Sequence, residues 1–153
     1  MPSLELKIPP PLVALACGAL MWFVARQTPF ASWPVAGRGI LALTFAALGV
    51  GISASGVVTF RRAGTTTNPM RPDSATILVT GGIYGRTRNP MYLGLSIVLI
   101  GWGVYLANAL ALLILPGFVR YVTRFQIQPE ERVLSALFGA RYQAYQASVR
   151  RWL

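Results

Sequence analysis

The longest uncharged stretch of this chain, residues 91–119, most constrains what the chain can fold into. It runs for 29 residues without a charged side chain, whereas a helix needs about 20 apolar residues to cross a bilayer. The stretch is too long for one upright span and too short for two complete ones. It therefore predicts either one strongly tilted helix or a hairpin. The hairpin would turn near residues 107–109 and continue past Arg120, whose long side chain can reach the interface.

Two further apolar stretches, residues 8–25 and 39–60, precede this one, and each is flanked by basic residues. The chain as a whole is 54% hydrophobic and only 12% charged, whereas charged residues make up about 25% of a soluble domain. Such an excess of apolar side chains requires lipid around it. Because 153 residues is one domain's worth, we expect residues 1–153 to form a single all-α domain embedded in a membrane.

The distribution of the basic residues favours the hairpin. With four spans, at about residues 8–25, 39–60, 91–107 and 109–125, twelve Lys and Arg residues lie on one side of the membrane and two on the other. With one tilted third span the counts become six and eight. Because Lys and Arg gather on the cytoplasmic side, we predict four spans in a bacterial inner membrane, with both termini and the loop 61–90 in the cytoplasm.

The net charge of +10 raises the question of nucleic-acid binding. The basic residues flank apolar stretches instead of forming one stripe, so contact with anionic lipid headgroups explains them better. The chain has no histidine and one cysteine, Cys17. Intrachain disulfides, metal sites of the usual His and Cys type and catalytic triads are therefore excluded. We expect neither a nucleic acid nor a metal as a partner.

The C-terminal segment, residues 129–152, carries helix signals. Pro129 suits a first turn, and Glu130 and Glu131 complement the helix dipole there. Apolar residues then recur at intervals of three and four. The pattern predicts an amphipathic helix that lies along the membrane interface or packs on the other helices.

The stretch "GGIYGRTRNPMYLG", residues 81–94, stands where the loop meets the third span. It can be a plain collar of aromatic and basic residues at the headgroups, or it can be a binding site. Gly82 permits close approach of a ligand, and the helix start at Pro90 offers free N–H groups to a polar one. Tyr84 and Tyr92 offer aromatic faces to an adenine ring or a cation.

Glu130 and Glu131 are half of the four carboxylates of the chain. They can serve as capping charges of the C-terminal helix. Alternatively, a carboxylate at this place can bind ribose hydroxyls or pair with a cationic ligand. The residues leave both interpretations open.

Taken together, the two segments resemble the superfamily of isoprenylcysteine carboxyl methyltransferases and phospholipid methyltransferases. Its pattern is G-x-Y-x-x-x-R-[HN]-P-x-Y-x-G, then an apolar hairpin, then E-E-x-x-L-x-x-x-F-G-x-x-Y-x-x-Y. The matching residues of this chain are Gly82, Tyr84, Arg88, Asn89, Pro90, Tyr92, Gly94, Glu130, Glu131, Leu134, Phe138, Gly139, Tyr142 and Tyr145. The resemblance extends from about residue 65 to the end of the chain.

The resemblance implies a methyltransferase that binds S-adenosyl-L-methionine in a pocket facing the cytoplasm and takes a lipidic or apolar acceptor from the bilayer. Methyl transfer depends on proximity and alignment, so it does not require histidine. Arg88 would orient an acceptor carboxylate and Glu131 would hold the ribose or amino group of the cofactor. The other implied cofactor contacts are Gly82, Tyr84, Asn89, Pro90, Met91, Tyr92, Glu130 and Tyr142.

The methyl acceptor stays open. Asn89 stands where the prenylcysteine branch typically has His, and Gln126 stands where that branch often has Arg. A prenylated protein, a phospholipid amine and a small apolar thiol or acid all remain, and an amine would need a base that this chain offers few candidates for. The alternatives to a methyltransferase are an NADPH-dependent membrane reductase of the sterol-reductase type and a non-enzymatic membrane subunit. The oligomeric state is not predicted.

Overall fold

The computed structural model describes residues 5–64, 73 and 75–153, and their named elements are all helical. The all-α expectation is confirmed. Besides helices, the described residues contain one isolated antiparallel bridge, between Ser32 and Asn108. The central loop was expected over residues 61–90, and much of it, residues 65–72 and 74, lies outside the described residues.

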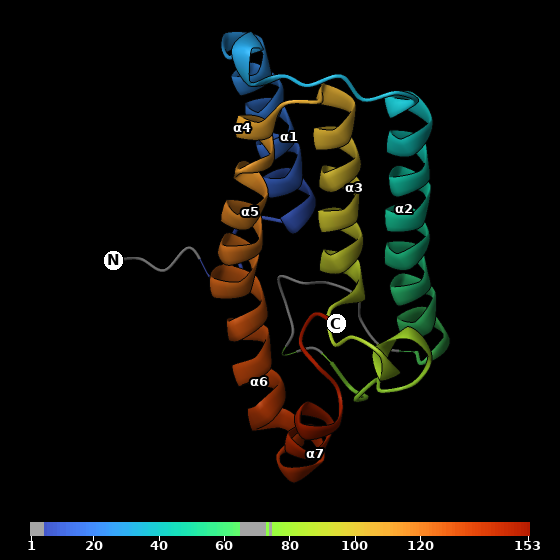
Figure 1. The fold of residues 1–153 in the computed structure, drawn as a ribbon. Coiled ribbons are helices and arrows are strands. Elements are labelled where there is room, and N and C mark those ends of the chain that lie inside the picture. Colours follow the sequence, from blue (N-terminus) through green and yellow to red (C-terminus); the bar gives the residue numbers. More distant parts are fainter. Residues whose placement is uncertain (1–4, 65–72, 74) are drawn as a thin grey trace.

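Three helices are long and apolar enough to cross a membrane: α1 (Pro10–Gln27), α2 (Arg38–Arg62) and the continuous helical run Ala109–Phe138. Helix α3 (Pro90–Leu106) is also apolar but shorter, with 17 residues. It packs against α2 on one side and against α1 on the other, as Figure 1 shows. Between α1 and α2 lies the short helix η1 (Pro29–Ala31).

Helices α2 and α3 approach each other closely at two glycines. A Cβ atom on Gly94 would lie 2.3 Å from the carbonyl oxygen of Gly49, and one on Gly49 would lie 2.5 Å from the carbonyl oxygen of Gly94. No side chain fits at either position. Small residues allow this kind of backbone contact between membrane helices, and it fixes α3 against α2 just above the loop that leads into α3.

The uncharged stretch 91–119 forms the predicted hairpin. Helix α3 ends at Ala107, which has a left-handed φ of 49°, and the next residue, Asn108, accepts a hydrogen bond from the N–H of Ala111. This cap starts α4 (Ala109–Leu112), and α5 (Ile114–Val122) follows. The chain thus returns along α3, and the loop before α3 comes to the same end of the bundle as the C-terminal segment (Figure 1).

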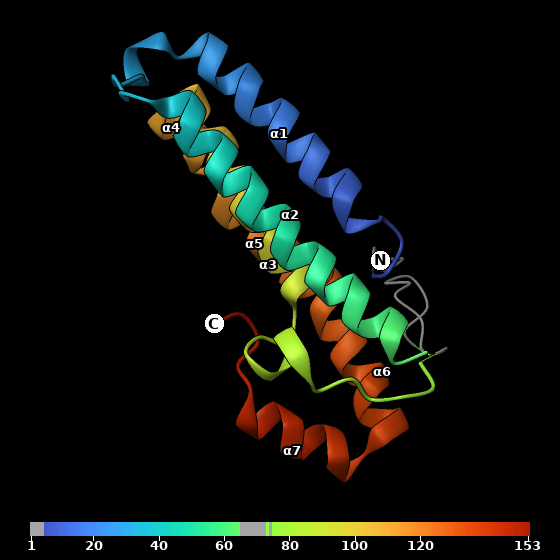
Figure 2. The same cartoon turned by 90° about the vertical axis from the view of Figure 1, so that its right-hand side faces the viewer.

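The last part of the chain differs from the single predicted helix over residues 129–152. Helix α5 continues through the π-helical turn η4 (Thr123–Ile127) into α6 (Gln128–Phe138), and a second helix, α7 (Ala140–Ser148), follows. Gly139, with φ 51° and ψ −128°, separates α6 from α7, a backbone conformation that side chains disfavour. Figure 2 shows α7 turning away from the direction of α6.

A hydrogen bond from the N-terminal segment explains how the chain stays helical past Pro129. Proline has no N–H, so it leaves the carbonyl oxygen four residues earlier without its helical partner. That carbonyl belongs to Phe125, and it accepts a hydrogen bond from the N–H of Leu6 at 3.0 Å. The N-terminal segment therefore supplies the bond that Pro129 cannot.

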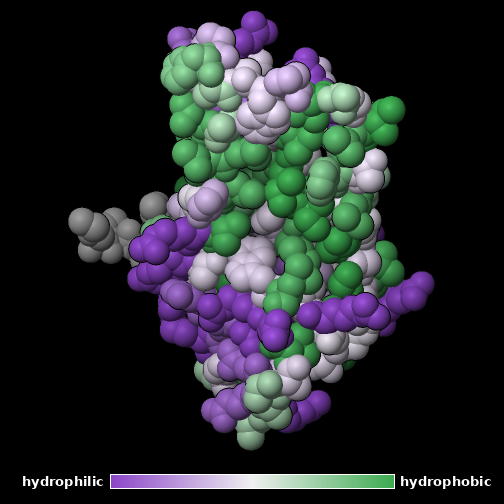
Figure 3. Space-filling model, in the orientation of Figure 1, coloured by the Kyte–Doolittle hydropathy of each residue, from purple (hydrophilic) through white to green (hydrophobic). Residues whose placement is uncertain are grey.

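The helical run Ala109–Phe138 has 30 residues, about 45 Å at 1.5 Å per residue, whereas the hydrocarbon of a bilayer is about 30 Å thick. Its charged last third, α6, therefore extends beyond the hydrocarbon. Figure 3 agrees with this placement: hydrophobic residues cover most of the bundle, and hydrophilic residues gather at the end formed by α6 and α7. The described helices fit an integral membrane protein.

Candidate active site

A cavity lies at the α6–α7 end of the bundle, where these two helices meet the loop 75–89 and the first turn of α3. It encloses about 840 Å³ of space between protein atoms, part of it open to solvent. Its lining residues are Phe60, Ala75, Ile77, Leu78, Val79, Tyr84, Arg88, Asn89, Pro90, Met91, Tyr92, Ile127, Glu130, Glu131, Leu134, Tyr142 and Tyr145. All the site residues predicted from the sequence except Gly82 are among them.

Gly82 shapes the loop beside the cavity. It opens the short helix η3 (Gly82–Gly85) with a left-handed φ of 60°, and a Cβ atom there would lie 3.3 Å from Oγ1 of Thr59 in α2. Its role in the structure is thus to turn the chain against α2. Tyr84, two residues later, carries the loop into the cavity wall, and the Tyr145 hydroxyl donates a hydrogen bond of 2.7 Å to its carbonyl oxygen.

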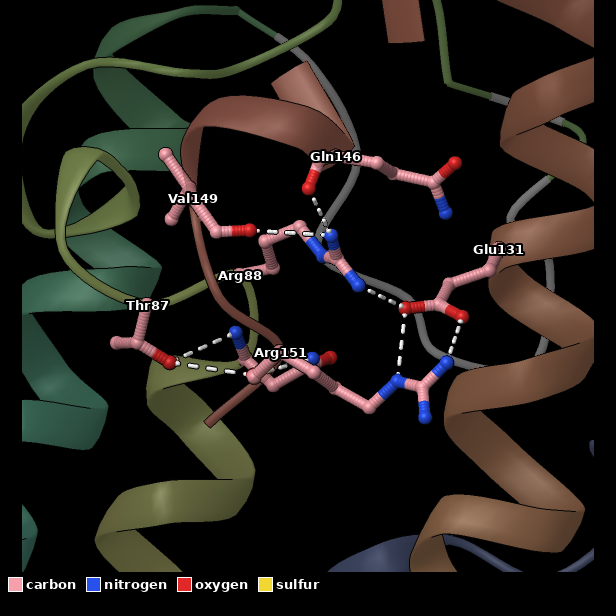
Figure 4. Close-up of polar contacts among 7 residues, drawn as sticks. Thr87, Arg88, Glu131, Gln146, Val149 and Arg151 are labelled. Carbon is pink, nitrogen blue, oxygen red and sulfur yellow. Dashed lines mark hydrogen bonds and ion pairs between the residues drawn. The ribbon is translucent and has the colours of Figure 1, made fainter. Parts of the chain in front are cut away.

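The predicted pair of catalytic residues forms one polar cluster together with Arg151 (Figure 4). Arg88 donates from one terminal nitrogen to Oε1 of Glu131 at 2.8 Å. Arg151 donates to both carboxylate oxygens of Glu131, at 3.0 and 2.7 Å. Charge-assisted and bidentate contacts of this kind are strong and directional. Glu131 is therefore held by two guanidinium groups, and the cluster has a net charge of +1.

Arg151 belongs to a segment that the sequence did not assign to the site, residues 149–152, which we call the C-terminal strap. It is fastened to the loop before α3: the N–H of Arg88 donates to the carbonyl oxygen of Arg150 at 3.0 Å, and the side-chain amide of Asn89 donates to that of Arg151 at 2.9 Å. The Thr87 hydroxyl, which is buried, donates to the same Arg151 oxygen at 3.4 Å.

Arg88 also ties α7 to this loop. Its second terminal nitrogen donates to the carbonyl oxygens of Gln146 and Val149, at 2.9 and 3.0 Å (Figure 4). Gln146 lies in the last turn of α7, where helices leave acceptors unpaired, and Val149 is the first residue of the strap. Arg88 therefore has a structural task besides any contact with a ligand: it fixes the end of α7 and the strap over one side of the cavity.

Glu130 lies in different surroundings from its neighbour Glu131. It lines the cavity, is partly buried and accepts a short hydrogen bond from the Tyr92 hydroxyl. No Lys or Arg among the described residues forms an ion pair with it. Burial raises the pKa of Glu130 to about 8, although the hydrogen bond from Tyr92 acts in the opposite direction; the nearby Glu131 carboxylate raises the pKa further.

Two hydrogen-bond donors in the cavity wall have no acceptor among the described residues: the Tyr84 hydroxyl and Nε of Arg88. Burial raises the pKa of Tyr84 above its ordinary value, so its hydroxyl keeps the proton. Buried polar atoms are nearly always paired in folded proteins, so this wall has unused capacity to bind an acceptor atom. Two further unpaired atoms, on Tyr121 and Gln126, belong to residues of the long helix that do not line the cavity.

The rest of the wall is apolar. It comes from α2, the loop before η3, the π turn and α6, and its residues are Phe60, Ala75, Ile77, Leu78, Val79, Ile127 and Leu134. The cavity lining thus combines three ionisable side chains, those of Arg88, Glu130 and Glu131, with apolar side chains from the loop and from the membrane helices. Such a combination suits one polar ligand and one apolar ligand that meet in the same space.

Comparisons with known proteins place this arrangement in a family. The family model described as phospholipid methyltransferase matches residues 38–141, more than half of the chain. A protein of Haemophilus influenzae, described as uncharacterized, is 43% identical over 52 residues, which are 34% of this chain and 82% of that relative. No solved structure matches the chain. The family match confirms the resemblance noted in the sequence and supports a membrane methyltransferase type of function. The chain belongs to the phospholipid methyltransferase family.

Proposed function

We propose that this protein transfers a methyl group from S-adenosylmethionine to a lipidic or apolar acceptor at the cytoplasmic face of the bacterial inner membrane. The observation that carries the proposal is the cavity itself. Residues of both sequence motifs line it, one set from the start of α3 and one from α6, together with apolar residues of α2, the loop and the long helix. The charged cofactor would enter from the cytoplasm and the acceptor from the bilayer. The rate of the reaction would then depend on how well the cavity aligns the acceptor atom with the methyl group.

The residues present fit such a cofactor. S-adenosylmethionine supplies an electrophilic methyl group on a positively charged sulfur, and it also carries an adenine, a ribose and an amino-acid group. Glu130 has no cationic partner among the described residues, and it lies with Tyr92 and Tyr84 in the cavity wall, a setting that suits a cation. Arg88 and Glu131 offer charged contacts for the amino-acid group or the ribose.

The acceptor side rests on the apolar wall. Phe60 continues the apolar face of α2 into the cavity, and Ile127 and Leu134 do the same from the long helix. Helices α2 and α3 and the first part of the run Ala109–Phe138 are predominantly apolar. An acceptor with a hydrocarbon chain would therefore keep that chain among membrane helices while its reactive group reaches the ionisable side chains.

Calorimetry with the purified protein in detergent micelles tests this function. S-adenosylhomocysteine, the product form of the cofactor, should bind, and both Arg88→Ala and Glu131→Gln should weaken it. Glu5→Gln is the matched control, because Glu5 also pairs with two arginines but lies away from the cavity. Wild-type protein that bound NADPH and not S-adenosylhomocysteine, or neither compound, would overturn the proposal.

A further inference from the structure

Glu130 is an acid in the cavity that pairs with no cation among the residues that the structure describes. The titratable groups around it are Tyr92 from α3, Tyr84 from η3, Tyr142 from α7 and the adjacent Glu131. Both arginines of the cavity end, Arg88 and Arg151, pair with Glu131 instead. A carboxyl group without a cationic partner in such surroundings keeps its proton until a cation binds beside it or until the pH rises.

The geometry leaves part of this carboxyl group free. Tyr92 donates to Oε1 of Glu130, and no hydrogen bond among the described residues engages Oε2. Glu130 also lines the cavity, so its side chain borders the space that a ligand would occupy. Glu131, by contrast, has both oxygens bound by guanidinium groups, so it is a poor proton acceptor.

We propose that Glu130 is the proton acceptor of methyl transfer, ionised while a sulfonium faces it and protonated by the acceptor as that positive charge disappears. This inference rests on the proposed function. In the reaction, a lone pair on the nitrogen or sulfur of the acceptor forms a bond to the methyl carbon. The bond from that carbon to the cofactor's sulfur breaks, its electron pair stays on the sulfur as a neutral thioether, and the N–H or S–H proton passes to Oε2 of Glu130.

The timing follows from electrostatics. Burial holds the pKa of Glu130 near 8 in the free cavity, and an opposite charge within a few ångströms lowers a carboxyl pKa by about 1–3 units. The carboxylate is thus ionised when the reaction begins. It becomes a stronger base as the sulfonium is consumed, so it takes up the proton of an acceptor that attacks as a neutral amine or thiol in the same step.

The proposal narrows the acceptor class. A carboxylate acceptor has no proton to lose and needs no base, whereas an amine or a thiol does. A chain without histidine has few groups for that task, and Glu130 fills it. We therefore infer an acceptor of the amine or thiol class on an apolar carrier.

The number of protons released when the cofactor binds tests the role of Glu130 without a measurement of turnover. Titrations in buffers of different ionisation enthalpy give the number of protons released, and S-adenosylmethionine is compared with S-adenosylhomocysteine, which differs in lacking the methyl group and the positive charge. For the wild type near pH 7, S-adenosylmethionine should release about half a proton or more beyond its product form. Above about pH 9 the difference should vanish, because Glu130 is then already ionised.

Glu130→Gln should remove the difference in proton release between the two ligands. It should lower the affinity for S-adenosylmethionine about tenfold and leave the affinity for S-adenosylhomocysteine nearly unchanged. Glu131→Gln is the matched control: it should lower the affinity for both ligands and keep the difference in proton release between them. Equal proton release for the two ligands in the wild type, or a difference that persists in Glu130→Gln, would overturn the inference. Equal methylation of a carboxylate acceptor by wild type and Glu130→Gln would overturn the acceptor class.

A second measurement covers the case in which Glu130→Gln does not fold. The infrared band of a protonated carboxyl group should disappear when S-adenosylmethionine is added to the wild type and persist with S-adenosylhomocysteine. A band that responds to neither ligand, although both bind, would contradict the inference and leave the proposed function standing. Failure of both ligands to bind would instead contradict the proposed function itself.

Discussion

Two carboxylates in this molecule are each held by a pair of arginines, and the two clusters differ in what surrounds them. Glu5 pairs with Arg124 and Arg132 on the outside of the long helix, and the side chains of these arginines are 54% and 57% exposed. Glu131 pairs with Arg88 and Arg151, and the side chains of Glu131 and Arg88 are only 12% and 10% exposed.

The comparison distinguishes a structural ion-pair cluster from one that belongs to the candidate site. The Glu5 cluster fixes the N-terminal segment beside the π turn, where Leu6 binds the carbonyl oxygen of Phe125, and none of its three residues lines the cavity described above. The Glu131 cluster also fastens segments, α7 and the strap, but it faces a cavity and includes Arg88, whose Nε has no acceptor among the described residues. The same pair chemistry thus serves stability in one place and leaves unused binding capacity in the other.

The largest expected difference between the clusters is the effect of removing the acid. Glu131→Ala leaves Arg88 with an unpaired charge in a nearly buried position, so we expect a loss of about 3 kcal/mol in the free energy of unfolding. We also expect a loss of about a hundredfold in affinity for S-adenosylhomocysteine, since a hydrogen bond to a charged group contributes about 1.5–3 kcal/mol. Denaturant unfolding in micelles and calorimetry measure the two quantities. An affinity close to that of the wild type would show that the Glu131 cluster, like the Glu5 cluster, is only structural.

Arg151→Met gives the next largest effect. Methionine keeps the apolar stem but removes both bonds to Glu131, which Arg88 alone then holds by one oxygen. We expect about a tenfold loss of affinity for S-adenosylhomocysteine, because a less restrained carboxylate binds less well, with unfolding changed by no more than about 1 kcal/mol. Arg132→Met, which removes the same kind of contact from Glu5, should leave affinity unchanged. Equal affinity of the two variants for S-adenosylhomocysteine would show that the strap does not contribute to the site.

The strap also marks the limit of what the sequence predicted. The motifs around Arg88 and Glu131 were identified because each is a compact local pattern, and the hairpin was predicted because an uncharged stretch can be measured against the thickness of a bilayer. The contact of Arg151 with Glu131 joins segments through side chains and backbone carbonyls with no periodicity. The sequence signal was slight: two arginines, at 150 and 151, directly after the helix.

The break at Gly139 and the continuity past Pro129 were missed for opposite reasons. Gly139 was treated as part of one helical period, although its φ of 51° in the structure is a conformation that glycine adopts easily. Pro129 was taken to start a separate helix, whereas the chain is already helical there. The bond from Leu6 to Phe125 makes this possible, and no local sequence pattern predicts a contact between residues so far apart.

Two buried asparagines provide a finer version of the comparison, with smaller expected effects. Asn89 donates to the carbonyl oxygen of Arg151 beside the cavity, and Asn108 donates to that of Thr28 at the opposite end of the bundle, at 2.9 and 2.8 Å. Replacing either by Ala should lower the free energy of unfolding by about 1 kcal/mol, because a partly buried carbonyl oxygen loses a hydrogen-bond donor. Asn89→Ala should also reduce affinity for S-adenosylhomocysteine several-fold, since it loosens the strap. A similar loss of affinity in Asn108→Ala would mean that affinity follows overall stability.

The smallest expected effect is that of Glu5→Gln. The Glu5 side chain is 22% exposed and its arginines are more than half exposed, so solvent and salt screen the pairs and their removal should change unfolding by no more than about 1 kcal/mol. Glutamine still accepts hydrogen bonds, and the backbone bond from Leu6 to Phe125 remains. Affinity for S-adenosylhomocysteine should equal that of the wild type. A clear loss of affinity would mean that the N-terminal segment acts on the cavity through the π turn, because Ile127, the last residue of that turn, lines the cavity; the two clusters would then be coupled parts of one site.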